Sequence, residues 1–230
     1  MKRIEGLRTQ LDAVGYLKSV KKLLGVTYRD LSSLLDLPES VLSRYVTGDM
    51  LPSVETAHEI LKKLEEAYPI AAVVKARVKT YETYVDMSFV NLPEFWRLYE
   101  VYLARRFPDL RVDVVLTAAA DGIPLAVTAA SRFEASLVVA KQYREPGVEN
   151  YEYTYLREGR PVTLHIPATQ IKRDAKVFIV DDIARTGKTL KALVGLCNKA
   201  EARVVGASVL VARRDLNIEV DFPVDVLYTY

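Results

Sequence analysis

The segment from Val177 to Leu190 reads VFIVDDIARTGKTL, in which an apolar run leads into two adjacent carboxylates and a glycine turn. The apolar run predicts a buried strand, and the letters TGKT predict the start of a helix. A helix start presents unpaired backbone N–H groups to anions, and carboxylates beside it accept hydrogen bonds from ribose hydroxyls. We therefore expect the segment to bind a ribose that carries a phosphate. The expected binding residues are Asp181, Asp182, Ala184, Arg185, Thr186, Gly187, Lys188 and Thr189.

Strand-like apolar runs alternate with helical segments through the rest of residues 112–230. The expected strands lie at 114–116, 137–139, 177–180, 204–211 and 226–228, with helices beginning at Ile123 and Thr186. Continuous apolar strands that alternate with helices indicate a parallel α/β sheet with helices on both faces. Ligands of such sheets bind at the carboxyl ends of the strands, which places the expected site in loops 117–122, 141–160 and 181–189.

The composition is that of a folded globular protein, because half of the 230 residues are apolar and 27% are charged. The N-terminus is too charged for a secretory signal and no apolar run is long enough to span a membrane, so we expect a cytoplasmic protein with no membrane partner. Cys197 has no cysteine partner, and His58 and His165 are far apart, which predicts no metal bound directly by the chain. The net charge of +2 provides no general attraction for nucleic acid.

Three helices are expected in the first 48 residues. Apolar residues at helical spacing predict a helix over 7–24 that ends at Gly25. Thr27 with Asp30 forms a capping-box pattern that predicts the start of a second helix, and a proline turn then leads into a third helix over 39–46. Two short helices across a tight turn predict a helix-turn-helix, whose second helix enters the major groove of DNA.

The stretch LPESVLSRYVTG at residues 37–48, followed by Leu51-Pro52-Ser53, resembles the repressor-type helix-turn-helix family. The resemblance implies that residues 39–46 form the recognition helix, with Val41, Leu42 and Tyr45 facing inward. Residues 1–67 contain ten Lys or Arg and ten Asp or Glu, so a neutral helical bundle for dimerisation or capping is the alternative. The expected contacts to double-stranded DNA are Arg29, Glu39, Ser40, Ser43 and Arg44.

The middle of the chain carries the expected domain boundary. An amphipathic helix follows Ser53 and ends before Pro69, which divides the chain into a domain at 1–68 and another at 69–230. Valines and tyrosines that alternate with polar residues predict strands over 74–90, and a helix is expected from Asn91–Glu94 onward. The segment of about 74–107 resembles the hood of orotate-type phosphoribosyltransferases, with an ordinary hairpin and helix as the alternative.

The letters GKT at residues 187–189 do not form a Walker A loop, because Asp182 stands where that motif needs a glycine. Four apolar residues, two aspartates and TGKT instead resemble the signature of type I phosphoribosyltransferases, which bind phosphoribosyl pyrophosphate. The resemblance also implies Mg²⁺ bound through that ligand. It further implies a pyrophosphate site formed by Ala118, Ala119, Ala120, Asp121, Gly122 and Lys141.

Two departures from the enzymes favour a ligand sensor over a catalyst. Hypoxanthine-guanine members carry an acid before the Thr-Gly of the loop, whereas Arg185 stands here and cannot act as a general base. Orotate enzymes carry a histidine in their mobile loop, whereas residues 142–160 contain none. That region instead places Tyr151, Tyr153 and Tyr155 at every second position, which predicts an extended arm with three tyrosines on one face, or a hairpin that covers a dimer interface.

A helix-turn-helix joined to a phosphoribosyltransferase-like domain resembles transcription regulators of nucleotide metabolism, in particular an archaeal group similar in design to the bacterial purine-operon repressor. The resemblance implies a homodimer that reads an inverted-repeat promoter site and senses phosphoribosyl pyrophosphate or a nucleotide. An active nucleobase phosphoribosyltransferase, of orotate or purine type, is the first alternative. A non-catalytic interaction protein without DNA affinity is the second.

Overall fold

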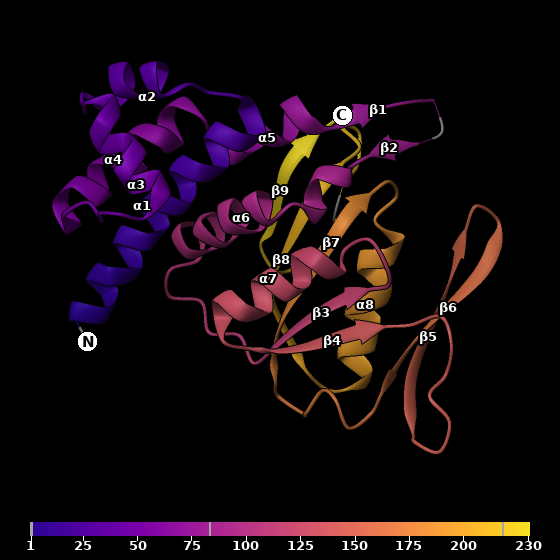
Figure 1. Ribbon diagram of the computed structural model, residues 1–230. Helices are drawn as coiled ribbons and strands as arrows, with labels where there is room; N and C mark the ends of the chain where they lie inside the picture. The colour runs from indigo at the N-terminus through magenta and orange to yellow at the C-terminus, as the bar shows by residue number, and fades with distance from the viewer. Residues whose placement is uncertain (1, 83, 218) are drawn as a thin grey trace. The chain divides into compact units, whose positions relative to one another are not determined.

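Figure 1 shows the computed structural model, which describes residues 2–82, 84–217 and 219–230. The chain forms two compact units, Met1–Arg106 and Phe107–Tyr230. The domain boundary expected between residues 68 and 69 falls inside the first unit. The division into functional domains at 1–68 and 69–230 therefore stays a prediction. Among the described helices, none is both long and apolar enough to cross a membrane.

Over residues 2–82 and 84–106 the first unit is helical apart from one short two-stranded sheet. Helix α1 packs against α4 and α6, and the Ser19 hydroxyl donates a hydrogen bond to the backbone oxygen of Glu94 at 2.6 Å. The elements in chain order are α1 (Lys2–Leu24), α2 (Tyr28–Leu35), α3 (Glu39–Thr47), α4 (Val54–Ala67), α5 (Ile70–Arg77), β1 (Lys79–Thr80), β2 (Val85–Asp86), the 3-10 helix η1 (Ser88–Asn91) and α6 (Pro93–Arg106).

The ends of the helix-turn-helix confirm the capping residues expected from the sequence. The Thr27 hydroxyl accepts from the backbone N–H of Asp30 at 3.2 Å, and the Asp30 carboxylate accepts from the backbone N–H of Thr27 at 2.9 Å. Gly48 ends α3 with a φ of 91°, a left-handed conformation that glycine adopts without steric cost. Leu42 and Tyr45 form the buried face of α3, and the opposite face of this helix is exposed to solvent.

Residues 70–77 form helix α5, and the expectation of strands beginning at residue 74 is therefore wrong for that part of the segment. Ile70, Val73 and Val74 are buried with the spacing of one helical face, and alanines between them favour a helix. Only β1 and β2 are extended in this region, and Thr83 lies outside the described residues. The helix expected near residues 91–94 is confirmed as α6.

The second unit is built on a five-stranded parallel sheet, as the sequence predicts. The strand order is β4-β3-β7-β8-β9, and every neighbouring pair is parallel. Its elements are β3 (Val114–Ala118), α7 (Ile123–Phe133), β4 (Ser136–Ala140), β5 (Asn150–Arg157), β6 (Arg160–Pro167), β7 (Lys176–Ala184), α8 (Lys188–Lys199), β8 (Arg203–Ala212) and β9 (Val224–Thr229).

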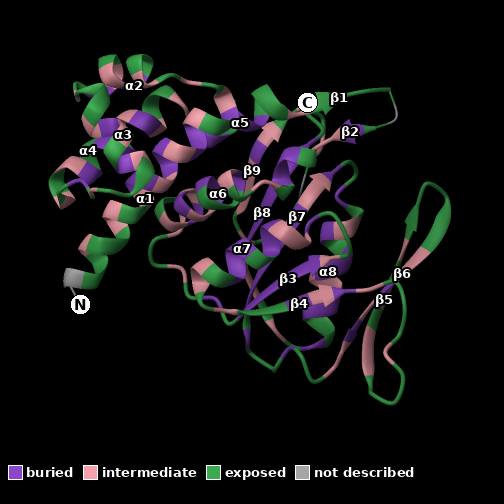
Figure 2. Ribbon diagram, viewed as in Figure 1, coloured by how far each residue is buried: buried purple, intermediate pink, exposed green. Residues whose placement is uncertain are grey.

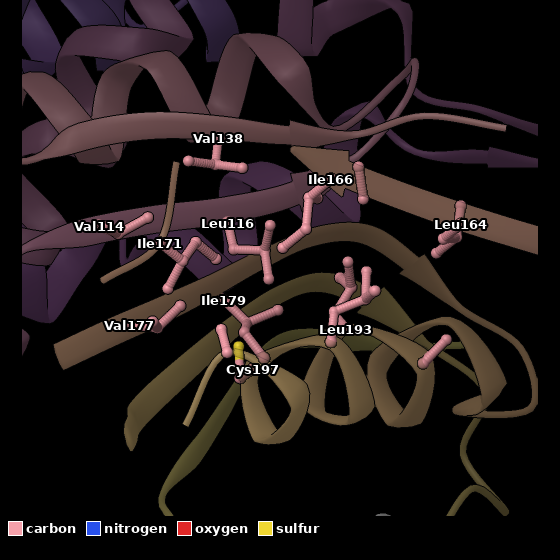
Figure 3. Packing of buried hydrophobic residues seen from close by; sticks show 14 of the residues in the cluster. Val114, Leu116, Val138, Leu164, Ile166, Ile171, Val177, Ile179, Leu193 and Cys197 are labelled. Carbon is pink, nitrogen blue, oxygen red and sulfur yellow. The ribbon is translucent and has the colours of Figure 1, made fainter. Parts of the chain in front are cut away.

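Alternate residues of the sheet pack against different helices, and Figure 2 shows the three inner strands β3, β7 and β8 to be mostly buried. Leu116 and Ile179 join Leu193 of α8 in one buried cluster (Figure 3). The ring of Phe178, one residue before Ile179, instead lies with its centroid 5.1 Å from that of Phe133 on α7. Because successive side chains of a strand point to opposite faces, this arrangement confirms helices on both faces of the sheet.

Strands β5 and β6 form an antiparallel hairpin that packs against α8. Tyr151, Tyr153 and Tyr155 lie on one face of it, as their spacing predicts, and all three contact the buried cluster beneath α8. This tyrosine face is therefore covered by its own chain. Of the two structures that the sequence allowed, an extended arm or a hairpin, residues 150–167 form the hairpin.

Gly195→Ala is expected to destabilise the second unit by about 1–3 kcal/mol, the usual cost of overpacking. An added Cβ would lie 2.2 Å from the Tyr153 ring, so the hairpin would have to move off α8. Gly15→Ala is the matched control, because that helical glycine has open space around it and alanine favours a helix by about 1 kcal/mol. Guanidinium unfolding measures both. Equal stability gains in the two variants would contradict the described packing of Tyr153.

Candidate functional site

The predicted ligand loops meet at the carboxyl ends of β3 and β7, which are neighbours in the sheet. The backbone N–H of Ala119 donates to the oxygen of Ala140 at 3.0 Å, which joins loop 118–122 to the residue before Lys141. A Cβ added to Gly122 would lie 3.6 Å from the backbone nitrogen of Asp182, and the Ala119–Ala120 peptide bond is cis. The structure thus brings loops 118–122, 140–141 and 181–182 together.

Asp181 and Asp182 end the buried part of β7 in different environments. Asp181 is only 5% exposed, and its Oδ2 atom has no hydrogen-bond partner among the described residues. Burial, followed by the charge of Asp182, holds the pKa of Asp181 well above its usual range. Burial also raises the pKa of the half-buried Asp182, and the Asp121 carboxylate acts in the same direction. A buried carboxylate oxygen without a partner is an acceptor that a ligand hydroxyl can satisfy.

The turn after β7 presents backbone donors beside these carboxylates. Helix α8 begins at Lys188, two residues later than expected, and Gly187 precedes it with a φ of 68°. Side chains at this left-handed position would be strained, so glycine suits it. Arg185, Thr186 and Lys188 are exposed, whereas Ala184 and Gly187 are buried. The unpaired N–H groups of the first turn of α8 and its helix dipole therefore favour an anion here.

Lys141 lies immediately after β4, where the sequence places it, but its ammonium group already has a partner. Its Nζ atom donates to the Glu145 carboxylate at 2.5 Å, and this bond raises the pKa of Lys141. The ammonium also lies 5.2 Å from the centre of the Tyr143 ring. An anionic ligand would have to compete with Glu145 for this lysine.

The sequence did not predict any role at the site for the β5–β6 hairpin, but two of its residues, Arg157 and Tyr155, influence or approach the site. The charge of Arg157 lowers the pKa of Asp181, opposing the larger effects of burial and of Asp182. The Tyr155 hydroxyl lies 3.5 Å from the hydroxyl of Thr189. The sequence does contain one signal for Arg157, because the Glu158-Gly159 turn predicts that Arg157 ends a strand. Sequence spacing does not show whether the end of that strand lies near the aspartates.

The predicted DNA contacts all lie on the α2–α3 segment. Arg29 on α2 and Glu39, Ser40 and Arg44 on α3 are exposed, whereas Ser43 is half-buried. The α3 backbone is anchored below by Leu42, which is fully buried. The exposed residues of α3 therefore include the cation Arg44, the carboxylate Glu39 and the hydroxyls of Ser40 and Thr47. Arg44 and the hydroxyls can hydrogen-bond to bases and phosphates, and a carboxylate can accept from cytosine.

Asp181→Asn is expected to stabilise the protein at pH 7. The folded-state pKa of Asp181 is raised, so its contribution to stability is greatest below its unfolded pKa and declines as the pH rises toward the folded value. An amide does not ionise, so the Asn variant does not lose stability as the pH rises. Each kcal/mol by which its free energy of unfolding exceeds that of the wild type would raise the melting temperature by about 2–4 °C. Melting curves of both proteins from pH 4 to pH 8 measure it. A wild-type protein that melts higher at pH 7, or a difference independent of pH, would contradict the burial of this carboxyl.

Comparison with known proteins finds a matching family model for each of two parts of the chain. Residues 88–229 match the family model described as phosphoribosyl transferase domain, and residues 17–68 match a helix-turn-helix model. The chain is 30% identical to adenine phosphoribosyltransferase of Gluconobacter oxydans over 150 residues, which cover 64% of this chain and 84% of that protein. It is 31% identical to the purine biosynthesis transcriptional repressor PurR of Bacillus subtilis over 108 residues, 46% of this chain and 38% of the repressor.

A solved structure supports the same fold. The crystal structure of adenine phosphoribosyltransferase from Rhodothermus marinus aligns with a TM-score of 0.63 at 22% identity, covering 70% of this chain and 98% of that one. The parallel sheet, the strand-turn-helix of β7 and α8, and the match over most of the second unit agree with one another. The chain therefore belongs to the phosphoribosyl transferase domain family and carries a helix-turn-helix ahead of that domain.

Proposed function

We propose that the protein is a DNA-binding transcription regulator of purine or pyrimidine nucleotide metabolism, whose second unit senses phosphoribosyl pyrophosphate or a nucleotide. The observation that carries the proposal is the presence, in one chain, of a helix-turn-helix with an exposed recognition face and a phosphoribosyltransferase-type site. The similarity to a repressor of purine biosynthesis supports the same design.

In this proposal the ligand's ribose hydroxyls donate to Asp181 and Asp182, where no described residue hydrogen-bonds to the Oδ2 atom of Asp181. The backbone N–H groups at the start of α8 bind the 5′-phosphate. Loop 118–122 and Lys141 receive the pyrophosphate once Lys141 releases Glu145.

Mg²⁺ would arrive with phosphoribosyl pyrophosphate and neutralise its charge. In the described part of the chain, no group of three or more His, Cys, Asp or Glu side chains is arranged to hold a metal. We therefore propose that the oxygen atoms of the ligand itself would supply most of the coordination of Mg²⁺, as the sequence resemblance implies.

Arg185 supports a sensor rather than an enzyme. It is an exposed cation in the turn that leads into α8, and a guanidinium cannot accept a proton at neutral pH. The β5–β6 hairpin supports the same assignment, because its tyrosine face is packed on α8. A catalytic lid would have to open and close over the site.

An active nucleobase phosphoribosyltransferase is the second candidate. It is favoured by the similarity to adenine phosphoribosyltransferase of Gluconobacter oxydans over most of that protein's length. The assay that separates the two candidates offers the purified protein phosphoribosyl pyrophosphate, Mg²⁺ and each nucleobase in turn, and measures pyrophosphate release. We expect binding without turnover. Release of pyrophosphate with any base at an enzymatic rate would establish the second candidate in place of the sensor.

Regulation in this proposal follows from linkage between the two units in a homodimer. Two recognition helices related by a twofold axis would read an inverted repeat. The protein would have two arrangements of these helices that differ in DNA affinity. The ligand can change DNA affinity only to the extent that it binds one arrangement more tightly than the other.

A further inference from the structure

We propose that the second unit carries a second ligand site, for a nucleoside phosphate, at the amino ends of its strands. A cavity of about 720 Å³ opens there between the starts of β7 and β8, the end of α8 and the segment before β9. Asp181 and Asp182 lie toward the other end of β7, so the two sites are distinct. The cavity volume falls within the range of roughly 300–1,000 Å³ typical of small-molecule sites, and it far exceeds the space needed by a phosphate ion.

Three cations and two carboxylates, Asp109 and Asp221, line this cavity, and the cations are grouped so that an anion can bind between two of them. Lys176 and Arg203 stand directly opposite each other on neighbouring strands, and Arg111 lines the same cavity. Like charges in such a pair repel each other. Within residues 2–82, 84–217 and 219–230, none of the three has an ion-pair partner, although Arg173, at the same edge, is paired with Glu201 at 3.0 Å. A phosphate bound between Lys176 and Arg203 would replace their repulsion with charge-assisted hydrogen bonds.

The remaining lining suits the rest of a nucleotide. Phe222 is half-buried against the core and offers an aromatic surface to a base. The exposed carboxylate of Asp221, next to it, can accept hydrogen bonds from ribose hydroxyls, and the side-chain amide of Asn198 can both donate to and accept from a base edge. Cations alone would fit any phosphate, but this combination points to a nucleoside phosphate.

The test uses the full chain with the first site disabled by Asp181→Asn and Asp182→Asn together. Calorimetric titration with AMP and with GMP is expected to show one saturable binding event per chain, whereas adenosine or inorganic phosphate alone should bind at least about tenfold more weakly. Lys176→Ala and Arg203→Ala should each weaken nucleotide binding about tenfold or more. Arg173→Ala is the matched control, because this arginine is already paired and does not line the cavity.

The melting temperature of Arg203→Ala without ligand checks that the variant is folded, and we expect it to equal or exceed that of its parent, since one repelling charge is gone. Failure of both nucleotides to bind the doubly substituted chain would overturn the proposal. So would nucleotide binding that Arg203→Ala leaves unchanged, or that Arg173→Ala weakens to the same extent.

Discussion

Replacing Asp181 and Asp182 together with asparagine is expected to weaken binding of phosphoribosyl pyrophosphate about 100-fold or more, because hydrogen bonds to charged groups contribute about 1.5–3 kcal/mol each. The Oδ2 atom of Asp181, which has no hydrogen-bond partner in the part of the chain that the structure describes, gives the ligand an acceptor that an amide replaces poorly. Calorimetric titration in the presence of Mg²⁺ measures the loss. The response of DNA binding to the ligand should disappear with it.

Loss of binding in this variant would not be an effect of unfolding, because Asp181→Asn is expected to raise stability at neutral pH. Asp174→Asn is the matched control, since this exposed carboxylate has a φ of 61°, which asparagine tolerates. It should bind the ligand as the wild type does. Retention of near wild-type affinity when both Asp181 and Asp182 are replaced would show that the ligand lies elsewhere.

Arg44→Ala is expected to lower affinity for the promoter DNA about 10- to 100-fold, since a bidentate arginine contact to guanine contributes roughly 1–3 kcal/mol. Arg44 is exposed on α3, and the buried Leu42 and Tyr45 hold that helix in place, so the substitution should leave the fold intact. Fluorescence anisotropy with labelled DNA from upstream of the protein's own gene measures the change.

The control for Arg44→Ala is Lys62→Ala, which removes an exposed cation from α4, outside the recognition helix. It should change affinity much less. If the two variants bind DNA equally well, α3 does not read the promoter, and the neutral bundle for dimerisation or capping becomes the better account of the first unit.

Local signals in the sequence predicted the elements on which the site is built. Thr27 and Asp30 form the capping box that their spacing predicts, and Gly48 ends α3 in the left-handed conformation. The strand with two aspartates followed by TGKT likewise forms β7 and α8. The predictions of these features are confirmed because each feature is determined by interactions between residues that are neighbours in the sequence.

Features that depend on distant partners were predicted poorly. The valines and tyrosines from residue 74 onward alternate with polar residues and so predicted strands, but Val74 is buried with Ile70 and Val73 on one face of α5, which packs against α1 and α6. Leu7 and Leu11 match the helical spacing of α1 but remain exposed, because spacing cannot tell where a covering element ends. The approach of the Tyr155 hydroxyl to Thr189 and the Lys141–Glu145 bond likewise depend on how the hairpin and its preceding loop fold back.

The central claim is that one chain couples a phosphoribosyl ligand to DNA binding, and reciprocal linkage tests it most directly. The DNA dissociation constant is measured with and without saturating phosphoribosyl pyrophosphate and Mg²⁺, and the ligand dissociation constant with and without saturating DNA. We expect both constants to change by the same factor, about 5- to 150-fold for an ordinary allosteric coupling. A DNA affinity that is identical with and without the bound ligand would contradict the sensor assignment.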